Sequence, residues 1–124
     1  MPQTIKIITK NVQVEAELND SPTARSIIQI LPIEALAQRW GGEIYFSVSV
    51  TADPESDSRD IVEAGELGYW PPSRAFCIFL GSTPLSHANE IRAASAVNIV
   101  GKMKGDWSGL WDVNSGDKIV IQIA

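Results

Sequence analysis

Apolar and polar residues alternate in several short segments of this chain. Residues 4–9 and 12–18 alternate on either side of Lys10-Asn11, and two such segments joined by two residues predict a β-hairpin. The same period of two recurs in residues 43–50 and 118–124. It is typical of strands that bury one face. In residues 43–50 we expect Ile44, Phe46, Val48 and Val50 to face inward, and Tyr45, Ser47 and Ser49 to face outward.

Helical periodicity is strong in one segment only. Asp20 or Ser21 has the character of an N-cap, and Pro22 suits the first turn that follows. Apolar residues then recur at the spacing i, i+3, i+4, i+7, at Ala24, Ile27, Ile28 and Leu31, and Pro32 ends the pattern. A weaker repeat of this spacing in residues 33–40 indicates either a short helix or helical turn, or an irregular loop with buried anchors.

The most distinctive stretch runs from residue 65 to residue 81. Trp70-Pro71-Pro72 cannot lie inside a helix, because each proline lacks an N–H and pushes the preceding residue towards extended geometry. Residues 75–80 are all apolar, and so short a run predicts a strand that is buried on both faces. The stretch therefore reads as strand, rigid turn, strand. We expect the Trp70–Pro71 bond to be trans, the default even before proline.

The other segments add short elements. Residues 51–60 are polar and predict a loop, and residues 81–94 are largely loop, with a helical turn possible in 88–94. Residues 95–103 predict a strand, and residues 105–111 predict one helical turn. The total is roughly seven or eight strands with no βαβ rhythm. We therefore predict one mainly β domain over residues 1–124, a closed or nearly closed barrel of about eight strands with one or two short helices.

Composition limits the classes of function. The chain has 124 residues, 44% apolar and 20% charged, and its net charge is −5. Such a charge argues against nucleic acid and against an anionic membrane surface as partners. Cys77 is the only cysteine, so a disulfide framework is excluded, and the N-terminus does not resemble a signal peptide. We expect a cytoplasmic protein.

A ligand site is predicted around the central turn. Tyr69, Trp70, Arg74 and Phe76 could line a pocket in which rings supply area and Arg74 orients a carbonyl or carboxylate. The alternative is that Trp70 packs over a barrel end and Arg74 is only solvated. Phe79 points to the other face of a regular strand, so we expect it in the core.

Two charged residues complete the candidate site. Arg25 falls in the first helical turn, where a cation opposes the helix dipole, so we expect an acidic partner or a ligand beside it. Glu43 is a candidate partner that rests only on the family resemblance of its segment, residues 40–46. A purely structural ion pair is the alternative.

No other residues suggest a reactive centre. His87 is the only histidine and lies in a polar loop, and Cys77 sits in an apolar run where it should behave as a small buried hydrophobe. The acids of the 51–60 loop lack the glycine and final Glu of an EF-hand; they are Asp53, Glu55, Asp57 and Asp60. We expect neither a metal nor a cofactor.

A second apolar group lies near the C-terminus. If residues 105–111 are helical, Trp107 and Trp111 stand one turn apart beside Leu110. This group either caps the barrel or contacts a protein partner.

The chain resembles the small cyclophilin-like proteins of bacteria and archaea, a family that is mostly uncharacterised. Trp70-Pro71-Pro72 is the most specific part of the likeness, which covers nearly the whole chain and rests on segments 20–25, 31–33, 40–46, 65–84 and 97–102. The resemblance implies a cyclophilin-type β-barrel of about eight strands with a helix over one end.

Fold alone does not give the function. Cyclophilins are peptidyl-prolyl isomerases with an arginine in a Phe-rich strand followed by Gln-Gly-Gly, and this sequence lacks that segment. We therefore expect a non-catalytic module that binds a peptide or a small molecule. The alternatives are a degenerate isomerase and a non-catalytic partner subunit of a larger complex, as in cyclophilin-like barrels of amide- and lactam-hydrolysing systems.

Overall fold

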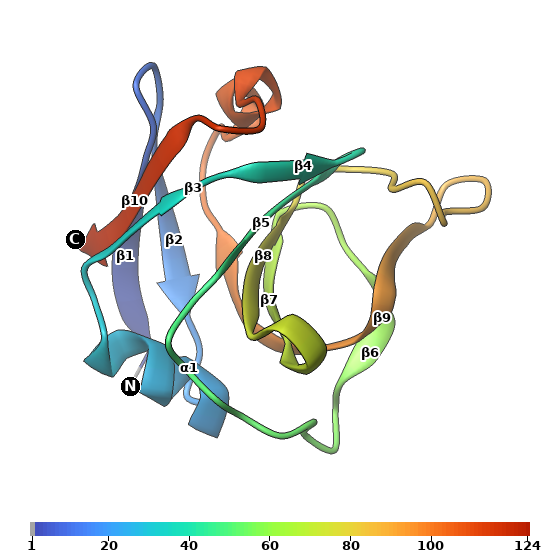
Figure 1. The fold of residues 1–124 in the computed structure, drawn as a ribbon, viewed down its shortest axis with the longest axis horizontal. Coiled ribbons are helices and arrows are strands. Elements are labelled where there is room, and N and C mark those ends of the chain that lie inside the picture. Colours follow the sequence, from blue (N-terminus) through green and yellow to red (C-terminus); the bar gives the residue numbers. More distant parts are fainter. Residues whose placement is uncertain (1) are drawn as a thin grey trace.

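A single curved antiparallel sheet makes up most of the molecule (Figure 1). The computed structural model describes residues 2–124, which contain ten strands, one α-helix and two 3-10 helices. The strand order is β3-β10-β1-β2-β9-β7-β8-β5-β4, and β6 pairs with β9 off this path. The strands are β1 (Gln3–Ile8), β2 (Gln13–Leu18), β3 (Ile33–Leu36), β4 (Gln38–Trp40), β5 (Glu43–Ser47), β6 (Arg59–Val62), β7 (Glu66–Trp70), β8 (Ala75–Phe79), β9 (Ile91–Met103) and β10 (Lys118–Ile123). The helices are α1 (Pro22–Gln29), η1 (Pro71–Ser73) and η2 (Ser108–Asp112).

The sheet is curled, and its two end strands are consecutive in the sequence. Its end strands, β3 and β4, are separated only by Ala37, whose N–H donates to the Asp117 carbonyl at 2.8 Å. No strand pairing joins β3 to β4 in the described residues. The mainly β class is therefore confirmed. The closed barrel of about eight strands is not, because the sheet has ten strands and its ends are not hydrogen-bonded to each other.

The hairpin and the helix begin where the sequence predicts. The Thr9 N–H donates to the Val12 carbonyl at 2.8 Å across the turn between β1 and β2. Ser21 is the N-cap of α1, because its hydroxyl accepts the Ala24 N–H at 3.2 Å. Ala24 and Ile27 are buried and attach α1 to the sheet.

A buried polar network ties α1 to the sheet and to the loop between β5 and β6. The Asn98 amide is fully buried on β9 and donates to the Thr23 hydroxyl and the Asp53 carbonyl, each at 3.0 Å. Its oxygen accepts the Glu55 N–H at 2.9 Å. The Glu55 carboxylate in turn accepts from the Thr23 N–H at 3.0 Å and from the Thr23 hydroxyl. This acidic loop is therefore part of the packed structure at Glu55.

Two helical interpretations of the sequence are wrong. Residues 33–40 form β3 and β4 instead of a helix or loop, because β3 pairs with β10 and β4 pairs with β5. The helical spacing there was misleading, since Leu36 is 64% exposed. In residues 88–94 no helical turn forms, and β9 begins at Ile91. In both segments, pairing with strands distant in the sequence determined the secondary structure.

The sheet separates two apolar layers. The main core lies between the N-terminal strands, α1 and one face of β5, β7 and β8, and it includes a stacked pair, Phe46 and Phe76, with ring centroids 5.6 Å apart. A smaller cluster on the opposite face of β8 includes Cys77 and Phe79. All five residues of β8 are buried, which confirms the strand predicted to be covered on both faces.

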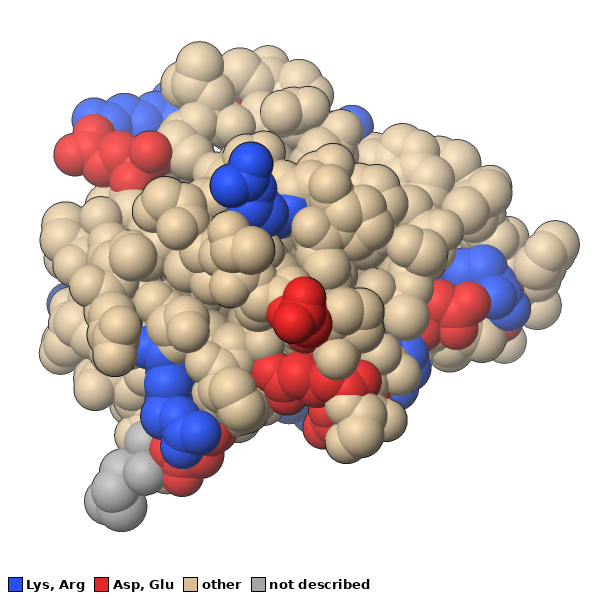
Figure 2. All heavy atoms as spheres, turned by 60° about the horizontal axis from the view of Figure 1, so that its bottom comes forward, with Lys and Arg blue, Asp and Glu red and all other residues tan. Residues whose placement is uncertain are grey.

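Three further observations concern the peptide bonds before proline, the surface charge and membrane-spanning helices. In the described chain the cis peptide bond precedes Pro32, and the Trp70–Pro71 bond is trans as expected. Figure 2 shows acidic side chains gathered near the middle of one face, whereas the basic side chains there stand further apart. No helix of the described residues is long and apolar enough to cross a membrane.

Candidate functional site

The floor of the candidate site is one face of four adjacent strands, β4, β5, β8 and β7. Side chains paired across neighbouring antiparallel strands share a face, because successive residues alternate. This face is the one opposite the main core. The pairs that build it are Trp40 with Glu43, Gln38 with Tyr45, Tyr45 with Cys77, Ser47 with Ala75, and Trp70 with Ala75.

The N-terminal half of β9 forms the facing wall. It leaves the main sheet to pair with β6, and it presents Ala93, Ala94 and Val97 to the site. Gly68 on β7 allows this close approach, since a Cβ there would lie 3.1 Å from a Val97 methyl carbon. Because Gly68 and the β9 residues Ala93 and Ala94 are small, β9 lies close to the floor and their side chains leave space for a pocket.

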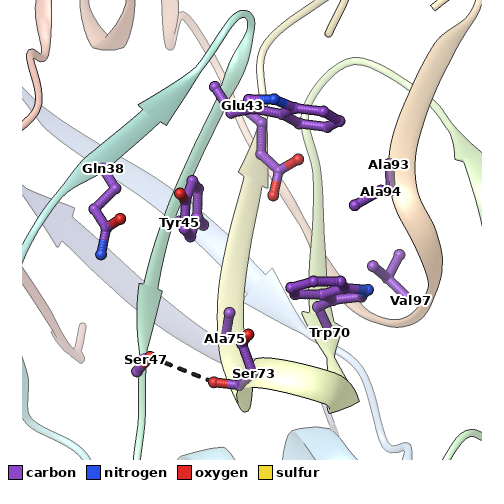
Figure 3. A pocket seen from close by; sticks show the side chains of 11 residues that line it. Gln38, Glu43, Tyr45, Ser47, Trp70, Ser73, Ala75, Ala93, Ala94 and Val97 are labelled. Atoms are coloured by element: carbon purple, nitrogen blue, oxygen red, sulfur yellow. Dashed lines mark hydrogen bonds between the residues drawn. The ribbon is translucent and has the colours of Figure 1, made fainter. Parts of the chain in front are cut away.

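The floor and the wall enclose a pocket of about 380 Å³. Its lining comprises Gln38, Trp40, Glu43, Tyr45, Ser47, Trp70, Ser73, Ala75, Ala93, Ala94 and Val97. Figure 3 shows the Glu43 carboxylate pointing into the space between Tyr45 and Trp70, with the β9 residues opposite. The size and the mainly apolar lining with few polar groups are those of a small-molecule site.

Glu43 is the unusual group of this pocket. Only 6% of the residue is exposed, and its carboxylate forms no ion pair with any described residue. Burial raises the pKa of Glu43 to about 7, an effect that a hydrogen bond from the Cys77 thiol partly opposes. The same burial, together with the nearby Glu43 charge, raises the pKa of the Cys77 thiol well above its ordinary value. Near neutral pH this carboxyl group is therefore divided between its protonated and its ionised form.

Hydrogen bonds hold the rim in place. The Trp70 indole N–H donates to the Ser95 hydroxyl at 2.6 Å, which fixes the ring between the floor and β9. The Ser47 hydroxyl donates to the Ser73 carbonyl at 3.3 Å and ties the end of β5 to η1 (Figure 3). These two hydrogen bonds position the Trp70 ring and η1 at the rim of the pocket.

Among the residues predicted from sequence, Trp70 and Glu43 meet in this pocket. Tyr69 and Phe76 do not, because both side chains are fully buried in the main core. The Tyr69 hydroxyl donates to the Val50 carbonyl at 2.5 Å, and desolvation raises the pKa of Tyr69. Phe76 therefore lies on the face of β8 opposite the pocket, whereas Phe79 is buried as expected.

The two arginines of the predicted site lie outside it. Arg74 ends η1 in the left-handed region, with φ 50°, and its side chain is exposed. Arg25 is exposed on α1, and it forms no ion pair with Glu43. Neither guanidinium makes a hydrogen bond or ion pair with another described residue. The predicted Arg25–Glu43 pair does not form, because Arg25 lies on the exposed surface of α1 whereas Glu43 is buried in the pocket.

The C-terminal aromatic group divides between core and surface. Leu110 is fully buried in the main core and Trp107 packs against that core, as expected of a cap. Trp111 is 46% exposed, and the Arg39 guanidinium lies 5.5 Å from its ring centre. A contact of Trp107, Leu110 and Trp111 with a protein partner stays a prediction.

Sequence reasoning missed most of the pocket. Tyr45 and Ser47 do face away from the main core as expected, but no pocket was predicted on that face, and Gln38 and Trp40 were assigned to a helix or loop. The sequence did contain one signal. Residues 75–80 were predicted to be buried on both faces, so some segment had to cover the face of β8 that points away from the main core. Nothing in the sequence indicated that β9 supplies that layer.

The fold and the site define a mainly β protein with an aromatic pocket around one buried carboxyl group. The chain belongs to the cyclophilin-like family, whose family model matches residues 3–122, and the resemblance seen in the sequence is thereby confirmed. It is similar to a hypothetical protein from Archaeoglobus fulgidus with a known solution structure, at a TM-score of 0.84 and 40% identity. The likeness covers 99% of this chain and 95% of that one. No match was found among the curated proteins.

Proposed function

We propose that this protein is a binding module for a small organic molecule, or for the side chain of a short peptide, at the pocket between β4, β5, β7, β8 and β9. The observation that carries the proposal is the aromatic pocket of about 380 Å³ with Glu43 at its centre. Trp40, Tyr45 and Trp70 supply area for an apolar group, and Glu43 orients a polar one.

The burial of Glu43 supports a functional role. A carboxyl group that is desolvated without a cationic partner costs folding free energy, so the fold alone gives no reason for it. A strongly shifted pKa inside a cleft is a recognised indicator of a functional site. The cost is explained if a ligand supplies the missing partner.

Prolyl isomerisation receives less support than binding. An isomerase needs a donor that stabilises the twisted amide, and the described lining includes no arginine or histidine for that task. The Gln38 amide is one remaining donor in the lining. We therefore keep isomerisation as an alternative, and a subunit role in a larger complex as another.

A proton-transfer enzyme is the second candidate, because a general acid or base works best with a pKa near the working pH, and that of Glu43 is about 7. Chemistry would convert the bound molecule, whereas a binding module would release it unchanged. Recording the ligand's own NMR spectrum over time separates the two functions.

The four tryptophans allow a direct test of the binding site. In a titration of ¹⁵N-labelled protein with a fragment library and short Xaa-Pro peptides, we expect binders to shift the indole N–H signals of Trp40 and Trp70. Those of Trp107 and Trp111 should stay unchanged, because neither residue lines the pocket. Exchange spectroscopy on the peptides reports isomerase activity in the same samples.

Two matched variants complete this test. Ala94→Phe adds a ring to the pocket wall and should weaken binding by at least about tenfold. Ala96→Phe adds the same ring at an exposed position of β9 outside the lining and should leave affinity unchanged. If Ala94→Phe binds normally, the site lies elsewhere. A library without any binder would contradict the proposed function.

A further inference from the structure

The pocket contains a negative group and no positive one. Its described lining includes no Lys, Arg or His. The other titratable groups on this face of β5 and β8 are the Tyr45 hydroxyl and the Cys77 thiol, which hydrogen-bonds to Glu43. The facing residues of β4, β7 and β9 carry no charge; they are Gln38, Trp40, Trp70, Ala93, Ala94 and Val97. Glu43 is therefore a carboxyl group for which residues 2–124 supply no cationic partner.

Arg39, the arginine closest to Glu43 in the sequence, makes its hydrogen bonds outside the pocket. Arg39 lies between the pocket residues Gln38 and Trp40 on β4, so it points to the other face of that strand. Its guanidinium donates to the Gly41 carbonyl at 2.7 Å and to the Val113 carbonyl at 2.7 Å. The alternation of β4 thus sends both uncharged side chains to the pocket and the cation away from it.

The aromatic rings, like the carboxylate, favour a positively charged ligand. Trp40, Tyr45 and Trp70 line the pocket, and the face of an aromatic ring attracts a cation. An ammonium group that reached Glu43 would form a charge-assisted hydrogen bond, which is shorter and stronger than a neutral one. An anion would meet repulsion from both components.

A metal ion fits these donors less well than an organic cation. Hard divalent cations take six or more oxygen ligands, whereas this pocket offers one carboxylate and a few amide or hydroxyl groups. No group of three or more His, Cys, Asp or Glu side chains gathers anywhere in residues 2–124. The apolar wall of Ala93, Ala94 and Val97 instead suits the hydrocarbon body of an organic ligand.

We propose that the pocket selects an organic cation, an ammonium group on an apolar body, with the charge at Glu43 and the body between the aromatic rings and β9. The inference rests on the proposed binding function and specifies its ligand class. The free carboxyl group binds a proton near neutral pH, so cation binding should displace that proton.

Three probes of one shape test the ligand class. Phenethylammonium is cationic, 2-phenylethanol is neutral and 3-phenylpropionate is anionic. At about pH 8, where Glu43 is ionised, we expect the ammonium probe to bind at least about tenfold more tightly than the alcohol. The anion should be the weakest. Dissociation constants come from calorimetry, and the indole signals of Trp40 and Trp70 locate the probe.

The carboxyl group is tested by pH and by substitution. At about pH 5.5 Glu43 is protonated, so the affinity for phenethylammonium should fall and that for the alcohol should stay constant. In Glu43→Gln the preference for the cation should vanish at both pH values. Glu15→Gln makes the same change of net charge at an exposed position on β2 and should keep the preference.

The outcomes separate this inference from the proposed function. If the alcohol or the anion binds at the indole rings as tightly as the cation, the ligand class is wrong and the binding function stands. A preference that survives Glu43→Gln also overturns the inference. If none of the three probes moves the indole signals, the inference fails, and the library titration alone decides the binding function.

Discussion

Replacing Phe76 by alanine is expected to lower the free energy of unfolding by about 3–5 kcal/mol. The ring is fully buried in the main core and stacks on Phe46, so truncation leaves a cavity that the sheet cannot collapse to fill. The pocket lies on the other side of β8, and its lining does not include Phe76. Urea unfolding measures the loss of stability. If Phe76→Ala does not fold, Phe76→Leu should show a smaller loss in the same direction.

A surface substitution is the control for this experiment. Leu36 is 64% exposed on β3, so Leu36→Ala should change stability by less than about 0.5 kcal/mol. Loss of ligand binding in Phe76→Leu with unchanged stability would contradict the assignment. It would return Phe76 to the site that the sequence predicted.

The second large effect is a gain of stability at high pH in Glu43→Gln. Burial raises the pKa of Glu43 to about 7 in the folded protein from an ordinary value of 4.5. Between these values the folded chain binds more protons than the unfolded chain, so its free energy of unfolding falls as the pH rises. The loss is complete above about pH 7 and amounts to roughly 3 kcal/mol for a shift of this size. The glutamine side chain does not ionise, so the variant does not undergo this loss of stability.

The difference between wild type and variant isolates this one group, because the other titrations are shared apart from that of the buried Cys77 thiol, whose pKa lies well above this pH range. At about pH 5 the two proteins should have similar stability, and at about pH 8 the variant should be more stable by roughly 2–3 kcal/mol. Glu15→Gln should show no such pH-dependent difference. A stability difference that does not change with pH would mean that Glu43 is ionised throughout in the folded protein.

Local patterns predicted much of the fold. The β1–β2 hairpin, the Ser21 cap and the doubly buried β8 follow from alternation, capping chemistry and an apolar run between Pro and Gly. Each depends on residues close in sequence. The same locality explains why the Trp70 turn was found.

The pocket could not be predicted in the same way, because its members come from strands distant in the chain. Trp40 lies in a segment whose apolar spacing resembles a helix until β5 and β10 supply strand partners. Phe76 was assigned to the pocket because a regular strand places it on the same face as Arg74. The pocket instead lies on the face of β8 that β9 covers, and β9 is distant in the sequence. Glu43 was taken as the partner of Arg25 from the segment that carries the family likeness, without any constraint on distance.

The pKa of the Glu43 carboxyl group tests the central claim most directly. In protein with ¹³C-labelled glutamate, the signal missing from Glu43→Gln identifies the side-chain carboxyl carbon of Glu43, and its shift is followed against pH. A midpoint of about 7 supports a desolvated carboxyl group at the centre of the pocket. A midpoint near the ordinary 4.5 would mean that water or a positive side chain reaches it, and would contradict both the proposed site and its preference for cations.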